Sequence, residues 1–528
     1  MAKKSGSNGR QRLSAADMAK QQREISVSEF FSKNRHLLGF DNPKRALLTT
    51  VKEAVDNSLD ACEEAGVLPT VHVNIKNVDE REDRFRVIVE DNGPGIVKDN
   101  VGKVFGKLLY GSKFHRLKMS RGQQGIGISA AGMYGQLTTG KPVVIISKTQ
   151  DEGEADYFEV VLDTKANEPK IAKEDTVEWN GHAGTSVQIE LEGSYQRGKW
   201  SVDQYLRMTA MANPHVSIYY SDPEGRDTAY ERATEVLPDE PRAIKPHPHG
   251  IELGTLIRIL QQTNSRTLKG CLQNDFSRVS KARSLKICEN AGLYENARPK
   301  RIARQEAENL LETIRNTKLR NPPMDCLAPI GEEQIKAGLT NILEVDFIEC
   351  VTRKPSVYRG IPFLIEVGIA YGGELSKDTQ AKLLRFANRV PLLYRSGACV
   401  ITQSCREMNW RQYKLDQPTG SMPVGPMMVL VHVASPWVPF TSESKEAVAS
   451  YPEIEKEVTL ALQQCARKLR VFLNKRHRKK EEKRKRRYIE KYIPHIGEAL
   501  HDILQFDAPE KERLVEDLTD ILESHRAG

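Results

Sequence analysis

The apolar pattern changes character twice along this chain, and that limits the possible fold more than any single motif does. Strand-like runs are interspersed with helical segments from about residue 25 to Pro238, disappear over 239–322, and return from 323 onwards. A chain of 528 residues is also too long for one ordinary core, so several domains are expected. Strands scattered among helices favour α+β layers, in which helices cover one face of an antiparallel-rich sheet.

The breaks in this pattern divide the chain into five predicted regions. We expect a flexible polar tail, a first α+β domain, an all-helical domain, a second α/β domain and a basic helical C-terminal region. Their predicted bounds are 1–24, 25–238, 239–322, 323–470 and 471–528. Pro-rich stretches at 238–248 and 321–324 mark the two inner breaks, because proline interrupts regular structure.

Individual elements are predicted from the spacing of apolar residues. Strands of the first α+β domain are expected at 71–75, 85–89, 143–147, 157–162 and 185–191. Helices of the all-helical domain are expected at 251–262, 268–275, 282–291 and 304–317. Strands of the second α/β domain are expected at 363–369, 384–394 and 427–433, before a long helix that begins near Tyr451. Two or three short helices are expected after Ile493.

Composition narrows the class of protein. A hydrophobic content of 39% with 28% charged residues is typical of a globular chain. The segment 1–19 has no apolar core of a signal peptide, and the apolar run 427–434 is too short to cross a membrane, so we expect a cytoplasmic protein. The eight cysteines have neither CxxC nor zinc-site spacing, which argues against a disulfide framework or a zinc knuckle. The net charge of +8 is only a weak indication of a polyanionic partner.

One predicted helix, over residues 51–61, carries polar side chains in a pattern suited to catalysis. Glu53, Asn57 and Asp60 recur at i, i+4 and i+7, which places them on one face of the helix. A carboxylate there can orient and deprotonate a water molecule, and an amide oxygen can bind Mg²⁺ beside a phosphate chain. The alternative is an ordinary amphipathic helix whose acidic face is solvated.

Two glycine-containing segments follow this helix. Asp91 ends a predicted strand, and Gly93 and Gly95 permit a tight turn that holds its carboxylate as an acceptor suited to an adenine amino group. The alternative is a plain surface turn. Further on, the glycines of the segment 122–127 precede a helix start, so backbone N–H groups could point at phosphates. This segment opens no βαβ unit and no Lys-Ser/Thr pair follows it, so neither a Rossmann nor a Walker motif fits.

Four short motifs occur in a fixed order along the first α+β domain. They are Glu-x-x-x-Asn at Glu53, Asp-x-Gly-x-Gly at Asp91, Gly-x-x-Gly-x-Gly at Gly122, and Gly-Thr at Gly184. In this order they resemble the nucleotide-binding boxes of the GHKL ATPases, the superfamily of gyrase B, MutL, the large heat-shock chaperones and histidine kinases. The resemblance implies an α+β ATPase sandwich that binds ATP and Mg²⁺.

The resemblance also implies a role for each matching residue. Glu53 would be the general base, Asn57 the Mg²⁺ ligand and Asp91 the reader of adenine. Thr185 would support the water network beside adenine, and the segment 122–129 would form a lid over the phosphates. The residues implied at ATP are Asn57, Asp91, Gly93, Gly95, Ser112, Lys113, Gly122, Gln123, Gln124, Gly125, Ile126, Gly127, Ile128, Ser129, Thr185 and Lys445.

Segments outside these motifs are similar to the B subunits of the archaeal-type DNA topoisomerase VI family. The segments 38–47 and 107–113 resemble that family more than they resemble chaperones or kinases. The all-helical region is similar to its helix–two-turn–helix domain, and the region 323–470 to its transducer domain with a long C-terminal helix. Lys445 lies where the family carries a lysine that reaches the γ-phosphate, so the resemblance implies a second catalytic group.

Membership of that family implies a function and partners. The chain would be the ATP-hydrolysing subunit of a type II DNA topoisomerase, dimerising through its ATPase domains when ATP binds. A partner A subunit would supply the DNA-cleaving tyrosine, giving an A2B2 heterotetramer on DNA duplexes, cytoplasmic and nucleoid-associated. Two alternatives stay open: a MutL-like repair ATPase, which would lack the helical insert, and a nucleotide-regulated DNA clamp with no topoisomerase role.

Basic residues are concentrated in two places. Lys281, Arg283 and Lys286 of the helical insert could meet DNA phosphates, or the insert could be a spacer that touches nothing. Ten of the thirteen residues from Lys475 to Arg487 are Lys or Arg. We interpret this run as an exposed helical stalk with an incidental attraction to DNA. It would lead into a C-terminal region that docks the A subunit.

Overall fold

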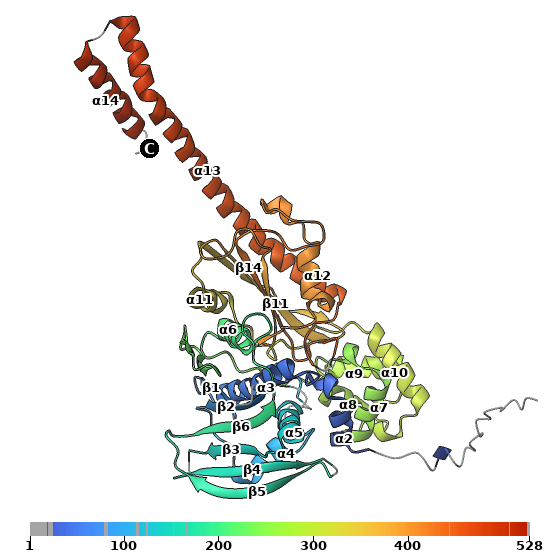
Figure 1. Cartoon of the computed structure of the whole chain (residues 1–528). Coiled ribbons are helices and arrows are strands. Elements are labelled where there is room, and N and C mark those ends of the chain that lie inside the picture. Colours follow the sequence, from blue (N-terminus) through green and yellow to red (C-terminus); the bar gives the residue numbers. More distant parts are fainter. Residues whose placement is uncertain are drawn as a thin grey trace, which may run out of the picture.

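The chain is described by a computed structural model in which three bodies and a projecting helical hairpin can be followed (Figure 1). The described residues are 18–19, 25–78, 83–111, 116–122, 125–150, 153–164, 166–442, 444–505 and 507–524. Four predicted nucleotide residues, Ser112, Lys113, Gln123 and Gln124, lie outside them, as does most of the predicted tail 1–24. No helix among the described residues is both long enough and apolar enough to cross a membrane.

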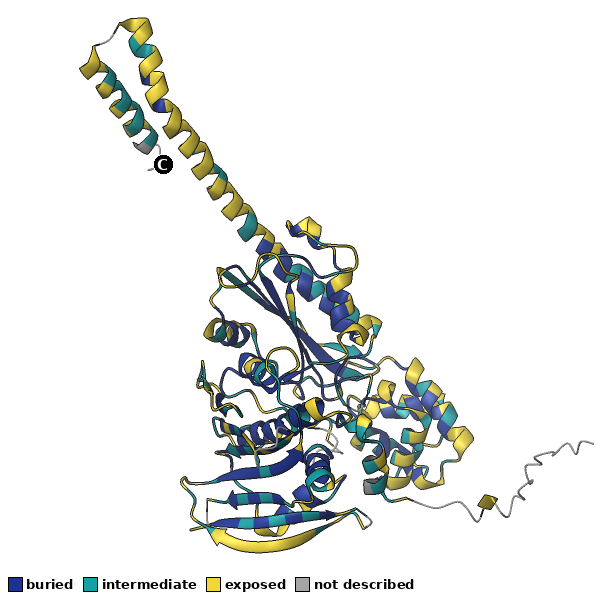
Figure 2. Cartoon of the chain, viewed as in Figure 1, coloured by how far each residue is buried: buried dark blue, intermediate teal, exposed yellow. Residues whose placement is uncertain are grey.

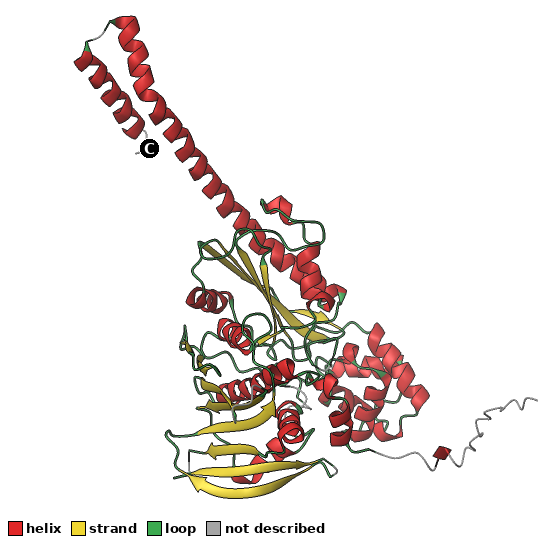
Figure 3. Ribbon diagram, in the orientation of Figure 1, coloured by secondary structure: helices red, strands yellow, loops and turns green. Residues whose placement is uncertain are grey.

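The first body is an eight-stranded sheet with helices on one face (Figure 3). The strand order is β5-β4-β3-β6-β2-β1-β7-β8, and all neighbours are antiparallel except the parallel pair β1–β7. The strands are β1 (Thr70–Asn77), β2 (Arg84–Asp91), β3 (Val143–Lys148), β4 (Ala155–Asp163), β5 (Glu168–Val177), β6 (Gly184–Glu192), β7 (Ser217–Ser221) and β8 (Asp227–Tyr230).

The helices of this body pack on the sheet because the strands alternate between buried and more exposed residues. In β1 the buried side chains are Val71, Val73 and Ile75, which share one core with the apolar face of α3. The helices are α2 (Val27–Lys33), η1 (Arg35–Leu38), α3 (Pro43–Glu64), α4 (Lys98–Gly106), α5 (Gly127–Thr139) and α6 (Val202–Ala212). Asn42 caps α3 by accepting a hydrogen bond from the Arg45 amide, and Pro43 follows at the first helical position.

The second body is all helical and has a core of its own, as predicted. It contains η2 (Pro248–Gly250), α7 (Leu253–Gln262), α8 (Leu268–Asn274), α9 (Lys281–Asn290), η3 (Pro299–Arg301) and α10 (Arg304–Asn316). Leu256, Leu272, Ile287 and Leu310 are completely buried in this core. The break predicted at 321–324 has neither helix nor strand, and the break predicted at 238–248 is irregular apart from a bridge at Ile244 and the start of η2. The five predicted domain limits stay predictions.

The third body is a mixed sheet covered on both faces. The order is β10-β11-β14-β12-β13, with β9 also paired to β11 and with β12 parallel to β14. The elements are α11 (Glu332–Ile342), β9 (Phe347–Thr352), β10 (Ser356–Tyr358), β11 (Ile361–Tyr371), β12 (Lys382–Ala387), β13 (Val390–Pro391), η4 (Ser396–Ala398), α12 (Val400–Glu407), η5 (Trp410–Tyr413) and β14 (Met427–Ala434). Every residue of β14 is buried, which fits a sheet with two covered faces.

The first and third bodies share a core, so they are docked firmly. Met208 and Met211 of α6 lie in one apolar cluster with Ile335 and Leu339 of α11. The two helices approach so closely that a Cβ atom on Gly338 would lie 2.2 Å from the carbonyl oxygen of Met211. The third-body sheet is therefore fixed against the first body through an apolar seam.

A helix of 53 residues, α13 (Pro452–Leu504), leaves the third body and projects into solvent (Figure 2). Its first turns are buried on the sheet as far as Leu469, and most of the remainder is exposed. The prediction of two or three short helices after Ile493 is wrong, because α13 continues through Pro494 to Leu504 and only α14 (Ala508–Ser524) follows among the described residues. Pro494 removes one helical hydrogen bond, but its surroundings are exposed, so water can satisfy the freed carbonyl.

Candidate active site

A cavity of about 690 Å³ lies between the helical layer of the first body and two loops of the third. Ligand pockets of this size commonly accept a nucleotide-sized molecule. The third-body wall consists of residues 391–394 and 444–446. Twelve of the predicted nucleotide residues line the cavity: Glu53, Asn57, Asp91, Gly95, Gly122, Gly125, Ile126, Gly127, Ile128, Ser129, Thr185 and Lys445. Gly93 is not part of this lining, but its amide donates a hydrogen bond to Asp91, which is.

One end of the cavity presents the carboxylate of Asp91, at the end of β2. Its Oδ2 accepts a hydrogen bond from the Ser58 hydroxyl at 2.6 Å, and its Oδ1 accepts one from the Gly93 amide at 2.9 Å. Burial raises the pKa of Asp91, and the bonds from Ser58, Gly93 and the Thr185 backbone oppose that rise. The carboxylate is thus held in one orientation, ready to accept a further hydrogen bond.

The turn after Asp91 requires glycine for a physical reason. Gly95 has φ +76°, and a Cβ atom there would lie 2.1 Å from the carbonyl oxygen of Lys148. Across the sheet, Asp91 pairs with Thr185, and a Cβ atom on Gly184 would lie 2.3 Å from the Asp91 carbonyl oxygen. Both glycines let neighbouring backbone come close to the residue that the cavity presents.

Another part of the cavity lining presents Glu53, which meets the N-terminus of α5. A Cβ atom on Gly127, the first residue of that helix, would lie 1.8 Å from the Glu53 Oε2. Glycine is therefore needed at this position to admit the carboxylate. A helix N-terminus carries unpaired N–H groups and a partial positive charge, which favour a carboxylate or a phosphate.

Two lysines set the charge around Glu53. Burial acts to raise the pKa of Glu53, but the ammonium groups of Lys52 and Lys445 outweigh it, so the pKa is lowered. The Lys52 Nζ lies 3.2 Å from Glu53 Oε1. Burial lowers the pKa of Lys445, and the nearby Glu53 carboxylate opposes that fall. Glu53 is consequently ionised at neutral pH, as a proton acceptor must be.

Asn57 lies one helical turn after Glu53 and is exposed to the cavity. A Cβ atom on Gly122 would lie 3.8 Å from its Oδ1, so the start of the predicted lid passes directly over this amide. No group of three or more His, Cys, Asp or Glu side chains that could hold a metal ion exists among the described residues. An amide oxygen with phosphates is a donor set that suits Mg²⁺, which keeps few protein ligands.

The loop that carries Lys445 is held in an unusual conformation. Lys445 has φ +52°, and its Nζ donates a hydrogen bond of 3.4 Å to the carbonyl of Arg121. The neighbouring Glu446 is buried, pairs with Arg45 at the start of α3, and lies 3.2 Å from Arg395. These ion pairs hold the loop against α3, and sequence motifs gave no indication of Glu446 or Arg45.

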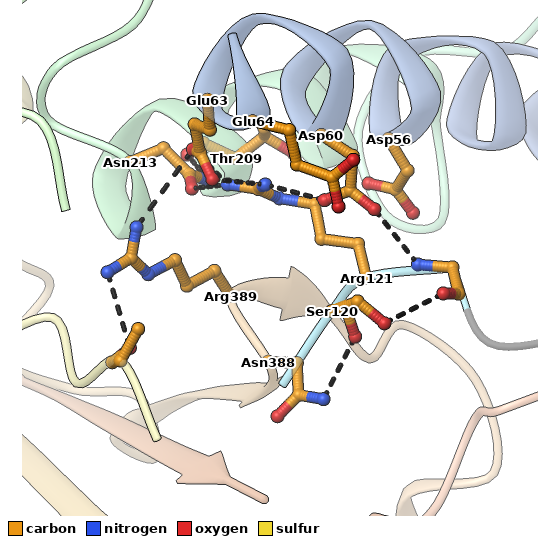
Figure 4. Close-up of polar contacts among 12 residues, drawn as sticks. Asp56, Asp60, Glu63, Glu64, Ser120, Arg121, Thr209, Asn213, Asn388 and Arg389 are labelled. Atoms are coloured by element: carbon orange, nitrogen blue, oxygen red, sulfur yellow. Dashed lines mark hydrogen bonds and ion pairs between the residues drawn. The ribbon is translucent and has the colours of Figure 1, made fainter. Parts of the chain in front are cut away.

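The stem of the predicted lid, residues 120–122, is tied to both bodies (Figure 4). The Arg121 guanidinium binds Asp60 at 2.9 Å, both Glu63 oxygens at 2.6 and 2.7 Å, and Asn213 at 2.6 Å. Burial acts to lower the pKa of Arg121, and these carboxylates raise it overall. The Gly122 amide donates to Asp60 at 3.4 Å. The polar face of α3 predicted to bear Asp60 thus supports the stem rather than facing open solvent.

Two family models match the chain. Residues 46–188 match the model described as histidine kinase-, DNA gyrase B- and HSP90-like ATPase. Residues 322–485 match the model described as the topoisomerase VI B subunit transducer. The first match covers the helix of Glu53 and the Asp91 turn, and the second covers the loop of Lys445.

Curated relatives named as the B subunit of type 2 DNA topoisomerase 6 match almost the whole chain. The protein of Methanococcoides burtonii is 49% identical over 497 residues, which cover 94% of this chain and 80% of the relative. That of Archaeoglobus fulgidus is 47% identical, covering 94% and 82%. That of Pyrococcus horikoshii is 40% identical over 547 residues, covering 94% and 95%.

Proposed function

The chain belongs to the family of type 2 DNA topoisomerase 6 B subunits, and from that premise we propose how its cavity serves the family's reaction. It is the ATP-hydrolysing subunit of a type II DNA topoisomerase. It uses ATP to pass one DNA duplex through a transient double-strand break that a partner A subunit makes in another. The observation that carries the site assignment is that Glu53 and Asp91 line one cavity, with a helix N-terminus beside Glu53.

ATP binds with adenine towards Asp91 and phosphates towards α5. The Asp91 carboxylate accepts the hydrogen bond of the adenine amino group, supported by Ser58. Backbone amides of the segment 125–127 face the phosphates, where the helix N-terminus favours negative charge. The residues of the lid and Thr185 complete the enclosure, and Ser112, Lys113, Gln123 and Gln124 are proposed at ATP on the family resemblance alone.

Hydrolysis follows from the charge at the Glu53 end. The ionised Glu53 takes a proton from a water molecule as that water attacks the γ-phosphate. The ammonium group of Lys445 neutralises the negative charge that develops on the transferred phosphoryl group. Asn57 would hold Mg²⁺ through its amide oxygen, and the ion would supply further charge neutralisation along the phosphates.

We further propose that ATP closes two copies of the chain around a DNA duplex. Dimerisation through the first bodies would form an A2B2 assembly with two A subunits. Because Lys445 belongs to the third body and reaches the nucleotide of the first, the hydrolysis step changes a contact between them. That change is passed through α13 to the A subunit.

Two surfaces suit the proposed partners. On α13 and α14, apolar side chains are exposed to solvent, among them Tyr488, Tyr492, Ile496 and Ile503. Exposed apolar groups at the tip of a hairpin support docking of the A subunit there. The basic run 475–487 on the exposed part of α13, and the exposed Lys281, Arg283 and Lys286 of α9, suit contact with DNA phosphates.

The chain alone should hydrolyse ATP but never cut DNA. A type II cleavage centre needs a tyrosine nucleophile and commonly a carboxylate cluster with Mg²⁺, and no such acidic cluster is present among the described residues. Incubation of supercoiled DNA with the chain, ATP and Mg²⁺, with and without the A subunit, tests the proposal. Relaxation is expected only with both subunits, and a protein–DNA adduct formed by this chain alone would contradict it.

A further inference from the structure

The tip of the hairpin between β12 and β13, residues Asn388 and Arg389, has an unusual backbone. The strands pair up to Ala387 and Val390, so only these two residues form the turn. Both are left-handed, with φ +48° and +68°. A two-residue turn with positive φ at both positions favours Asn first and Gly second. Arg389 therefore adopts a conformation disfavoured for its type, and such strain is retained where a side chain is needed.

Both side chains of the hairpin tip are buried between the first and third bodies (Figure 4). The Asn388 Nδ2 donates to the carbonyl of Ser120 at 3.0 Å and to that of Ser435 at 2.9 Å. Its Oδ1 accepts from the Ser435 amide at 2.9 Å. One amide group thus joins strand β14's end to the lid stem of the other body.

Arg389 reaches the support of the same stem. Its guanidinium donates to the carbonyls of Ala328 and Pro329 at 3.3 and 3.0 Å, and lies 3.9 Å from Glu63 Oε1. That carboxylate is the one that holds Arg121, and it also bonds His215 at 2.7 Å. Two buried arginines from different bodies therefore share a single half-buried carboxylate.

The third body consequently holds two consecutive carbonyl groups of the stem. Asn388 binds the carbonyl of Ser120, and Lys445 binds that of Arg121. A loop held at both carbonyls can rearrange over a nucleotide only if these bonds break or if the hairpin tip of Asn388 and the loop of Lys445 move with it. Breaking the Asn388 bond would leave the nucleotide site intact, because Asn388 does not line the cavity.

We propose that Asn388 is a positioning residue that links the lid to the transducer sheet, as a second connection beside Lys445. Arg389 supports it by holding the hairpin tip against Glu63. This inference rests on the proposed function, since the nucleotide must order the lid for the link to carry information. Its consequence is that, when the Asn388 bond is lost, ATP is still hydrolysed but fewer hydrolysis events lead to strand passage.

The variant Asn388→Asp tests the link. Aspartate tolerates the left-handed turn and still accepts the Ser435 amide, but its oxygens would face the carbonyls of Ser120 and Ser435. The measurement is the number of ATP molecules hydrolysed per strand-passage event by the full chain with its A subunit. We expect this ratio to rise at least fivefold, with kcat for ATP hydrolysis within threefold of the unaltered chain.

The matched control is Asn341→Asp. The Asn341 Nδ2 donates to the carbonyl of Glu231 at 2.8 Å, so this variant loses the same kind of bond between the same two bodies, away from the lid. The control ratio should stay unchanged. An unchanged ratio in Asn388→Asp, or an equal rise in both variants, would overturn the proposal.

Two further variants keep the proposal testable if the Asn388→Asp chain does not fold. Asn388→Gly keeps the turn and removes the same bond, so it replaces Asn388→Asp if that chain does not fold. Arg389→Gly suits the turn better than arginine but loses the bonds to Ala328 and Pro329, so a role confined to stability predicts an unchanged ratio in the folded chain. The proposal predicts a raised ratio instead.

The outcome can be separated from a failure of the proposed function, which would appear as no strand passage by the unaltered complex. In that case hydrogen exchange of the stem amides, residues 120–122, decides the question. Asn388→Asp should raise their exchange rate at least tenfold when an ATP analogue is bound. Equal exchange in both chains would overturn the link.

Discussion

The two walls of the cavity are built in different ways. The first-body wall comes from regular elements, with Glu53 and Asn57 on α3 and with Asp91 at a strand end. The third-body wall comes from loops at 391–394 and 444–446, held by ion pairs and by left-handed residues such as Lys445. In the proposed function, the adenine end therefore lies within the first body. The phosphate end combines Glu53 and α5 of the first body with Lys445 of the third, so a γ-phosphate bound there would report on how the two bodies are arranged.

Removing the proposed general base, Glu53, from the first-body wall should have the largest effect on ATP hydrolysis. Glu53→Ala should lower kcat for ATP hydrolysis by about 10² to 10⁴-fold, because general bases contribute that much. ATP affinity and nucleotide-dependent dimerisation should change little, since the base acts on water rather than on ATP. Steady-state turnover and ATP binding by fluorescence check this. Undiminished turnover would remove Glu53 from the mechanism.

Disturbing the contact between the start of α5 and Glu53 should have the next largest effect on ATP hydrolysis. In Gly127→Ala the added methyl group would occupy the position of the Glu53 carboxylate, which must move away. Misplacement of a catalytic group by about 1 Å costs up to roughly 10²-fold, so kcat should fall about 10- to 100-fold. Gly254→Ala is the control, because a Cβ atom in that helix meets nothing within 4 Å. Equal activity of both variants would contradict the close approach.

Removing the cation of the third-body wall, Lys445, should affect the coupling of ATP hydrolysis to strand passage more than it affects DNA binding. Lys445→Ala should lower ATP-dependent strand passage about tenfold while leaving DNA affinity unchanged. Losing this cation also raises the pKa of Glu53, so the acid limb of the kcat–pH profile should move to higher pH, since the protonated carboxyl cannot accept a proton. Lys414→Ala is a control with the same left-handed backbone (φ +69°) on an exposed residue. An equal loss of DNA affinity would make Lys445 an ordinary surface lysine.

The smallest effect on ATP hydrolysis should come from weakening the ion pairs that hold the loop of Lys445, with Lys445 itself kept. Glu446→Gln loses the ion pairs to Arg45 and Arg395, so the loop of Lys445 should be less well ordered. We expect the KM for ATP to rise about threefold, with kcat almost unchanged. Glu457→Gln, which breaks the pair with Arg353 elsewhere in the same body, should leave KM unaltered. A fall in kcat alone would argue for a direct catalytic role of Glu446.

Sequence patterns predicted the first wall better than the second for a physical reason. Glu53, Asn57 and Asp91 owe their placement to helical spacing and to a strand end, which are local properties of the chain. Glu446 and Arg45 are 401 positions apart, and their pairing follows from domain docking. The prediction of one strand over 384–394 is wrong, because Asn388 and Arg389 form a turn between β12 and β13. The contacts that hold this turn come from the first body and leave no mark in local spacing.

The strands that escaped prediction are either exposed or short. In β5, residues 168–177 carry acidic and basic groups, and most are exposed because the strand lies at the sheet edge. Without one buried face the alternation of apolar and polar residues is lost, and with it the pattern that predicts a strand. The short strands β7 and β8 were missed as well. Helices with a continuous apolar stripe, such as α7 and α10, were predicted almost to the residue.

The helix α13 has a mechanical consequence of its own. At 1.5 Å per residue its 53 residues span about 80 Å, and the part beyond Leu469 accounts for about 50 Å of that length. A rotation of about 10° of the sheet that anchors its first turns would swing the far tip through roughly 9 Å, if the helix stays straight. Through this helix, an ångström-scale rearrangement at the cavity can become a displacement of the far tip that is the size of a side chain or larger.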